Sequence, residues 1–212
     1  MPNWKQSASE ELANSISHGI GFVAALIGTP ILLLAAFRHG GTGFFLGTIV
    51  FTSTMVLLYL GSTLYHAWPP TRGKSVLQVF DHSAIFLLIA GTYTPIALGP
   101  LHGPWGSVVL AAIWALAIFG VILKTARGTS RHRTLSLCLY LGMGWLGILA
   151  LRPVLHLVPP LTLVWLVTGG IAYTLGVVFF VNEHRRYNHF IWHLFVLSGT
   201  GCHFAAVLTC AV

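Results

Sequence analysis

Apolar residues run through this chain in seven long blocks that are separated by short gaps. The blocks comprise residues 16–37, 44–65, 79–98, 105–123, 135–151, 161–181 and 190–212. Each is close to the ~20 residues that an α-helix needs to cross ~30 Å of hydrocarbon. The blocks lack the strict alternation of barrel strands and are rich in Leu, Ala and Gly. The pattern therefore predicts an all-α integral membrane protein of seven transmembrane helices.

The gaps between the blocks hold residues that stop helices. They include Gly40 with Gly41, Pro69 with Pro70, Gly99 with Pro100, and Pro159 with Pro160. Such pairs mark turns, so they predict short connections between neighbouring helices. We find neither a second domain nor an internal repeat in the sequence.

Composition supports a lipid environment. Of 212 residues, 56% are hydrophobic and only 7% are charged, and the mean hydropathy is +0.82. An average soluble domain carries roughly a quarter charged residues, so this chain has too little charge to cover a soluble surface. The formal net charge of +7 falls mainly in the gaps between blocks. That distribution is typical of membrane orientation and contact with anionic lipids, and it argues against nucleic-acid binding.

The basic residues are distributed unequally between the two sides of the predicted membrane domain. Nine fall on the side of the N-terminus: Lys5, Arg72, Lys74, Lys124, Arg127, Arg131, Arg133, Arg185 and Arg186. Only Arg38 and Arg152 fall on the other side. Because cytoplasmic loops carry the excess of Lys and Arg, we expect the N-terminus in the cytoplasm and the C-terminus outside. The predicted organisation is a cytoplasmic segment, residues 1–15, followed by a transmembrane domain, residues 16–212.

Four ionisable residues share one depth in this topology. Asp81, the only aspartate of the chain, stands near the start of the third helix, and His66 stands at the end of the second. His189 and His193 stand at the start of the seventh helix. All four lie at the predicted cytoplasmic ends of their helices. Ionisable groups at such depths are costly and often functional.

The spacing of these residues suits a metal ion. His189 and His193 are i and i+4 on one helix face, and His66 can supply a third nitrogen. Three protein ligands leave the fourth tetrahedral position of zinc for water, as in catalytic sites. Asp81 can then hydrogen-bond that water or orient a ligand, and Ser62, one turn before His66, can hold the water or a substrate oxygen.

Interfacial histidines without a metal are the alternative, because an HxxxH pair alone is a weak motif. The other histidines fit the site less well. His203 lies ~21 Å further along the helix than His189, so we expect it to be a separate buried hydrogen-bonding group. His82 points ~100° away from Asp81 on a helix. His18 is at the right depth to support a ligand.

Four strings in the chain carry a resemblance to a known family. They are EELANSISHGIG at 10–21, STLYH at 62–66, FDHSAIFLLIAGTYTP at 80–95 and YNHFIWHLFVLSGTGCHF at 187–204. Together they closely resemble the bacterial hemolysin III family, the prokaryotic branch of the progestin and adiponectin receptor superfamily. The resemblance implies a seven-helix protein of the bacterial inner membrane, with zinc near its cytoplasmic face. It also implies that His66, His189 and His193 bind the zinc, that Asp81 contacts its water, and that Ser62 is the serine of the S-x-x-x-H element.

The resemblance also suggests an activity. Members of the superfamily, including alkaline ceramidases, are thought to be metal-dependent hydrolases of lipid amides. We therefore expect hydrolysis of a lipid amide or ester by Asp81 and Ser62, with the bilayer supplying a lipid or acyl substrate. A non-enzymatic membrane-homeostasis or sensor protein with structural zinc is the alternative. A cytolysin or channel is a weaker one, because no helix shows a polar stripe suited to a pore. The pattern assigns no oligomeric state.

Two cofactor sites of other kinds are disfavoured. The axial ligands of a bis-His haem normally face each other from different helices, whereas His189 and His193 share one. A retinal Schiff base needs a lysine in the seventh helix, and the only lysines are Lys5, Lys74 and Lys124.

Overall fold

The computed structural model of the protein describes residues 6–128 and 133–211. Its elements are α1 (Ala8–His39), α2 (Gly41–Ala67), α3 (Arg72–Leu98), α4 (Pro104–Arg127), α5 (Arg133–Gly144), the 3-10 helix η1 (Leu146–Ala150), α6 (Leu151–Leu157), α7 (Pro160–Val181) and α8 (Asn188–Ala211). Within the described residues there is no strand, and 7 helical spans are long and apolar enough to cross a membrane, with Arg133–Leu157 counted as one. The predicted all-α, seven-span architecture is confirmed.

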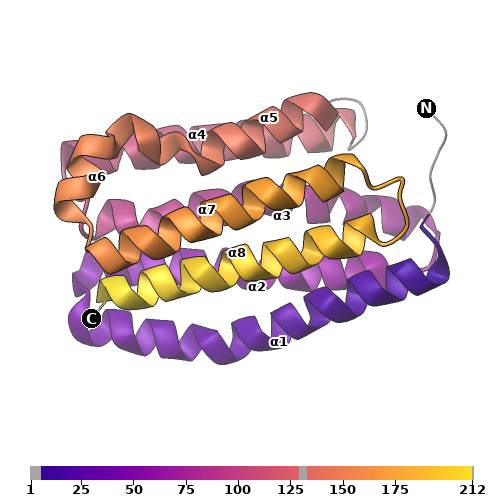
Figure 1. Ribbon diagram of the computed structural model, residues 1–212, viewed down its shortest axis with the longest axis horizontal. Coiled ribbons are helices and arrows are strands. Elements are labelled where there is room, and N and C mark those ends of the chain that lie inside the picture. The colour runs from indigo at the N-terminus through magenta and orange to yellow at the C-terminus, as the bar shows by residue number, and fades with distance from the viewer. Residues whose placement is uncertain (1–5, 129–132, 212) are drawn as a thin grey trace.

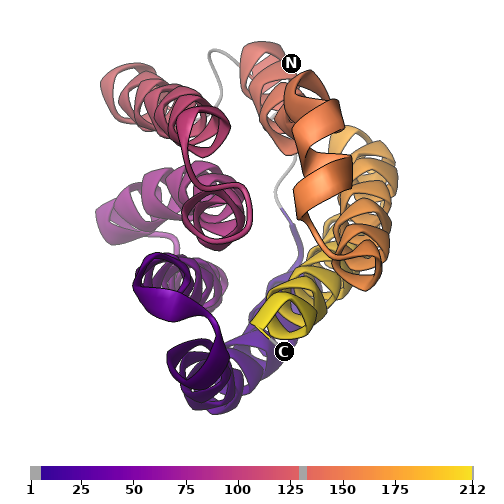
Figure 2. The ribbon, with the colours of Figure 1, turned by 90° about the vertical axis from the view of Figure 1, so that its left-hand side faces the viewer.

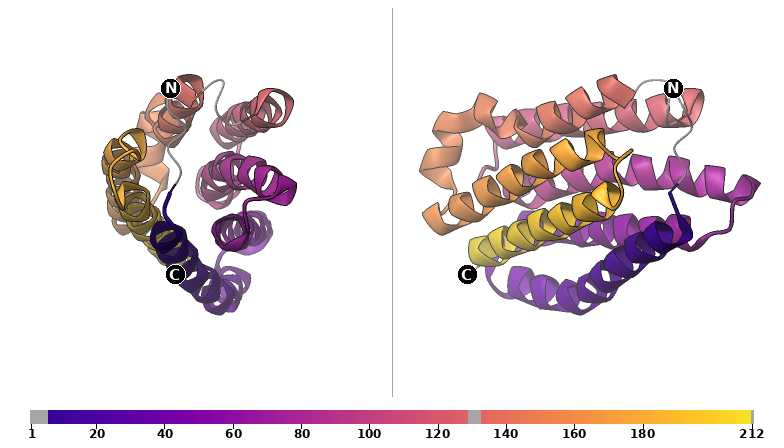
Figure 3. Two further views of the ribbon diagram at one scale, coloured as in Figure 1. Left: turned by 90° about the vertical axis from the view of Figure 1, so that its right-hand side faces the viewer. Right: turned by 45° about the vertical axis from the view of Figure 1, so that its right-hand side comes forward.

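The spans lie side by side with their connections at the two ends of the bundle (Figure 1). Viewed along the bundle, α1 to α4 follow one another along one side, and α5 to α8 return along the other (Figure 2). The helices thus form a ring, which is closed by the last helix, because α8 packs against α1 as well as against α7 (Figure 3). This closure places the start of α8 beside the start of α1.

The surface and the core have the distribution expected in lipid. Large apolar side chains such as Ile20, Phe37 and Leu149 point outwards, where water would be an unfavourable surrounding. The interior holds buried aromatic residues, including Phe51 and Phe86. A multi-pass membrane protein surrounded by a lipid bilayer accounts for both observations.

The first helix begins earlier than its apolar block. Ser7 is the N-cap residue, and its side chain accepts a hydrogen bond from the Glu10 backbone while the Glu10 carboxylate accepts one from the Ser7 backbone. This capping box starts α1 at Ala8, so most of the described part of the predicted segment 1–15 is helical, whereas residues 1–5 lie outside the described residues. The added turns carry polar side chains toward the histidines.

The fifth span is not the continuous helix that residues 135–151 predict. It breaks at Gly144 and continues through η1 and α6 to Leu157, with the turn visible in Figure 3. Glycine weakens helices, and three glycines, at positions 142, 144 and 147, fall at this break. Tyr93 satisfies the interrupted backbone, since its hydroxyl donates to the Gly144 carbonyl at 2.9 Å and accepts from the Gly147 amide at 3.1 Å.

Antiparallel packing brings the end of α2, the beginning of α3 and the beginning of α8 to the end of the bundle where α1 begins. We call this end the histidine end. It also holds most of the basic residues of the predicted cytoplasmic side: Arg72, Lys74, Lys124, Arg127, Arg133, Arg185 and Arg186. Lys5 and Arg131 lie outside the described residues, and Arg38 and Arg152 lie at the opposite end of the bundle.

Candidate metal centre

Three histidines from two helices converge at the histidine end. His189 and His193 are one turn apart at the start of α8, with ring centroids 4.8 Å apart. His66, in the last turn of α2, lies 5.2 Å from the His189 ring and 5.0 Å from the His193 ring. One ring nitrogen of each lies within 4.8 Å of the others, and all three residues are buried. The structure thus brings the three predicted ligands together, close enough to hold a metal ion.

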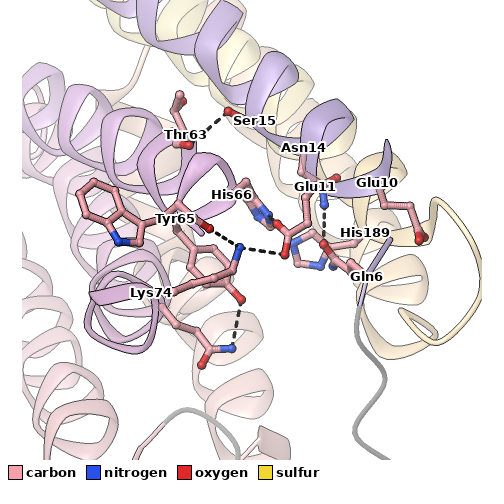
Figure 4. A network of polar contacts seen from close by, with 12 residues as sticks. Gln6, Glu10, Glu11, Asn14, Ser15, Thr63, Tyr65, His66, Lys74 and His189 are labelled. Carbon is pink, nitrogen blue, oxygen red and sulfur yellow. Dashed lines mark hydrogen bonds and ion pairs between the residues drawn. The ribbon is translucent and has the colours of Figure 1, made fainter. Parts of the chain in front are cut away.

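The Nδ1 atom of each histidine meets a polar group outside the cluster. The Glu11 carboxylate lies 2.7 Å from Nδ1 of His66, and the Glu183 carboxylate lies 3.4 Å from Nδ1 of His189 (Figure 4 shows the former). The backbone carbonyl of Asn14 lies 3.3 Å from Nδ1 of His193, and a hydroxyl, that of Ser17, lies 3.2 Å away. These are the partners that orient metal-binding imidazoles, because they fix the proton on Nδ1 and leave Nε2 free.

The second nitrogen of His66 supports this assignment. Its Nε2 is buried, and no group in the described part of the chain pairs with it. Since a buried polar atom without a partner is unfavourable, the site suits a ligand at that position. Three imidazoles form a donor set that zinc commonly takes.

Two ion pairs extend the network to the edge of the bundle. Glu11 also pairs with Lys74, at 2.9 Å, as Figure 4 shows. Glu183, in the connection between α7 and α8, pairs with Arg133 at 2.9 Å. Burial raises the pKa of the Glu183 carboxyl, but the hydrogen bond from His189 and the positive charge of Arg133 outweigh it and hold the pKa below its usual value. The carboxylate beside His189 is therefore ionised at neutral pH.

Ser62 and Asp81 lie beside the histidines. Both are buried, and together with His189 and His193 they line a cavity of about 20 Å³. That volume holds about one water molecule. The Ser62 hydroxyl approaches the Asp81 carboxylate without a well-formed hydrogen bond, so both groups can also contact an occupant of the cavity.

Two further histidines line the same cavity. His18, from α1, lies at the same depth as the proposed ligands, as the sequence predicts. His82 was expected to point away from the site, yet it lines the cavity next to Asp81. The reason is that the cavity covers a wide arc of α3, so adjacent residues of this helix both reach it.

His203 lies in a separate environment further along α8. Its Nε2 is 3.3 Å from the Leu166 carbonyl, and the residue lines a mainly apolar cavity of about 190 Å³ between α3, α7 and neighbouring elements. The prediction that His203 is a hydrogen-bonding group apart from the ligands is confirmed, but its side chain is half-buried because it faces this cavity.

The polar groups that contact Nδ1 of the three histidines were not predicted from the sequence. They are Glu11, Asn14 and Ser17 of α1, and Glu183 before α8. A signal for three of them was present, because the spacing 11, 14, 17 and 18 places polar residues along one face of a helix. The S-x-x-E capping signature at Ser7 would have extended that helix far enough to include them.

Seven apolar spans and a buried cluster of three histidines define a multi-pass membrane protein with a site able to hold a metal ion. The sequence profile of the family described as Haemolysin-III related matches residues 6–204. Because that match covers nearly the whole sequence, the chain belongs to the haemolysin-III-related family.

Individual relatives agree with this assignment. The chain is 42% identical to Hemolysin-3 of Bacillus cereus over 208 residues, which cover 98% of this chain and 94% of that protein. It is 40% identical to the Hemolysin-3 homolog of Bacillus subtilis (strain 168) over 199 residues, with coverages of 94% and 93%. It is 28% identical to the human Monocyte to macrophage differentiation factor over 219 residues, with coverages of 96% and 85%. The resemblance to the bacterial hemolysin III family and its superfamily is confirmed.

Proposed function

We propose that this protein is a zinc-dependent hydrolase of an amide or ester bond in a membrane lipid. One observation carries the proposal: three buried imidazoles converge, and two of them, His189 and His193, line a water-sized cavity together with Asp81 and Ser62. In this proposal His66, His189 and His193 hold the metal. A bound zinc ion supplies Lewis acidity, which polarises a carbonyl and makes water more acidic.

The remaining steps fall to side chains of this chain. The Asp81 carboxylate accepts a proton from the attacking water, as a general base. The Ser62 hydroxyl, which is buried beside the Asp81 carboxylate, turns its proton toward the oxygen that gains charge and donates a hydrogen bond to it. The packed end of the bundle excludes bulk water and so strengthens both interactions.

We place this site at the cytoplasmic face of the bacterial inner membrane. The concentration of basic residues at the histidine end supports that orientation. Anionic lipid head groups at the same face would favour contact with these residues. Reporter fusions at the two termini test it: a cytoplasmic reporter at the N-terminus and an exported one at the C-terminus are expected, and the reverse pattern would contradict the orientation.

The activity is tested with purified, zinc-loaded protein and two fluorescent substrates, a ceramide and a lipid ester, in mixed micelles. We expect turnover by the wild type and a loss of about 100-fold or more in Asp81→Asn, which preserves size but removes the base. His156→Gln, a change at the opposite end of the bundle, serves as the matched control. Turnover of neither substrate above the Asp81→Asn level by a zinc-loaded wild type would contradict the hydrolase function.

The small size of the cavity favours a second function, a non-enzymatic sensor or membrane-homeostasis protein with structural zinc. About 20 Å³ holds a water molecule but not the substituted carbonyl group of a lipid. In that case Asp81→Asn would complement a deletion strain fully while His193→Ala would not. A hydrolase requires both variants to fail.

A further inference from the structure

His18 is a buried imidazole with no role in the proposed metal set. It belongs to α1 and is 3% exposed. Its ring stacks on His193 with centroids 3.6 Å apart and planes 8° apart, and it meets the edge of Tyr59 at 5.1 Å. These two contacts hold the ring in one orientation.

Both ring nitrogens of His18 are buried, and neither makes a well-formed hydrogen bond within the described residues, although the His193 backbone approaches one of them. A buried imidazole has at least one N–H donor, and leaving it unpaired is unfavourable. His18 also lines the cavity of about 20 Å³ that Ser62 and Asp81 line. A small occupant of that cavity is therefore the natural partner for this residue.

The geometry argues against His18 as a fourth ligand. An ion bound by His193 lies near the plane of that ring, because the nitrogen lone pair lies in the plane. The His18 ring is parallel to it and stacked 3.6 Å away, so such an ion would lie well out of the His18 plane. The ring nitrogens that come within 4.8 Å of one another belong to His66, His189 and His193.

We propose that His18 donates a hydrogen bond to the oxygen atom of a water molecule that occupies the cavity beside the metal ligands. The inference rests on the proposed metal site and adds a residue that contacts and positions this water. Stacking fixes the direction of the donor before anything binds, which is the arrangement that stabilises developing charge. Together with Ser62, His18 gives the occupant two fixed hydrogen-bonding groups.

The test uses full-length protein loaded with Co²⁺ and fluoride as the probe, because fluoride is water-sized and a strong hydrogen-bond acceptor. Fluoride affinity is measured from the Co²⁺ absorption spectrum, and metal content by mass spectrometry. We expect His18→Phe to keep one Co²⁺ per chain and to weaken fluoride binding roughly 10- to 100-fold. His18→Asn keeps a donor and should bind fluoride within a few-fold of the wild type. His203→Phe removes a half-buried imidazole far along α8 and is the matched control.

Unchanged fluoride affinity in His18→Phe would overturn the proposal. The stacking of His18 on His193 would then serve only the packing of the two helices. Loss of Co²⁺ in this variant would also overturn it, because His18 would then act on the metal itself. If His18→Phe does not fold, His18→Met removes the donor with a more adaptable side chain and is judged by the same two measurements. A wild-type protein that binds no metal would refute both the metal site and this inference. If the wild type binds metal and the His18 variants bind fluoride with unchanged affinity, only the role of His18 is refuted.

Discussion

The Glu11 carboxylate lies 2.7 Å from Nδ1 of His66, although 55 residues separate them in the sequence (Figure 4). The contact joins α1 to α2. Asn14 and Ser17, also of α1, approach Nδ1 of His193. A helix without any of the three proposed ligands therefore orients two of them.

We expect Glu11→Ala to weaken metal binding about 10- to 100-fold, because partners of ligating histidines contribute about that much to metal affinity. Glu11→Gln keeps an acceptor without the charge and should lie between Glu11→Ala and the wild type. Chelator competition with Zn²⁺ on detergent-purified protein measures this. Lys74→Met is the control, since Lys74 pairs with the Glu11 carboxylate but makes no hydrogen bond to His66. Equal affinity in wild type and Glu11→Ala would show that this contact does not orient a ligand.

The three proposed ligands should be individually required. His66→Ala, His189→Ala and His193→Ala each leave two imidazoles, too few for a stable zinc site. We expect near one zinc per chain in the wild type and a loss of most of it in each variant, by mass spectrometry of purified protein. His203→Ala should retain the metal. Retention in any one of the three ligand variants would remove that residue from the set.

The sequence was informative about the spans and about the ligands, for different reasons. Apolar blocks near 20 residues define transmembrane helices because lipid leaves few alternatives, and i, i+4 spacing alone places His189 and His193 on one face. The approach of His66 followed from helix direction, since α2 ends where α8 begins. Antiparallel topology therefore fixed the depth of each proposed ligand.

Contacts between helices were harder to predict. The pairing of Glu11 with His66 depends on how α1 and α2 are rotated about their axes, which apolar periodicity leaves open when a helix is apolar all round. The break after Gly144 depends on the hydroxyl of Tyr93, from another span, to satisfy the exposed backbone. Spacing places Glu11 on a polar face of α1, but the sequence specifies neither its partner on α2 nor the partner of the Gly144 backbone.

Glu183 should make stability depend on pH in the acidic range. Its pKa in the folded protein lies below the ordinary value of 4.5, so the carboxylate contributes stability above that value. The contribution is lost as the pH falls through the lower, folded pKa. We expect the difference in melting temperature between wild type and Glu183→Gln to shrink as the pH is lowered from 7 to 3. A difference that stays constant over this range would show that the ionised form is not favoured by folding.

Close packing of α2 against α3 should make Gly47 sensitive to substitution. A Cβ atom added at Gly47 would lie 2.5 Å from Cα of Pro95, and backbone cannot move aside as a flexible side chain can. We expect Gly47→Ala to destabilise the protein by about 1–3 kcal/mol, the usual cost of overpacking. Gly142→Ala is the matched control, because nothing lies within 4 Å of its added Cβ and alanine is the better helix former in α5. Thermal unfolding in detergent compares the two, and a Gly47→Ala protein as stable as Gly142→Ala would contradict the close approach of α2 and α3.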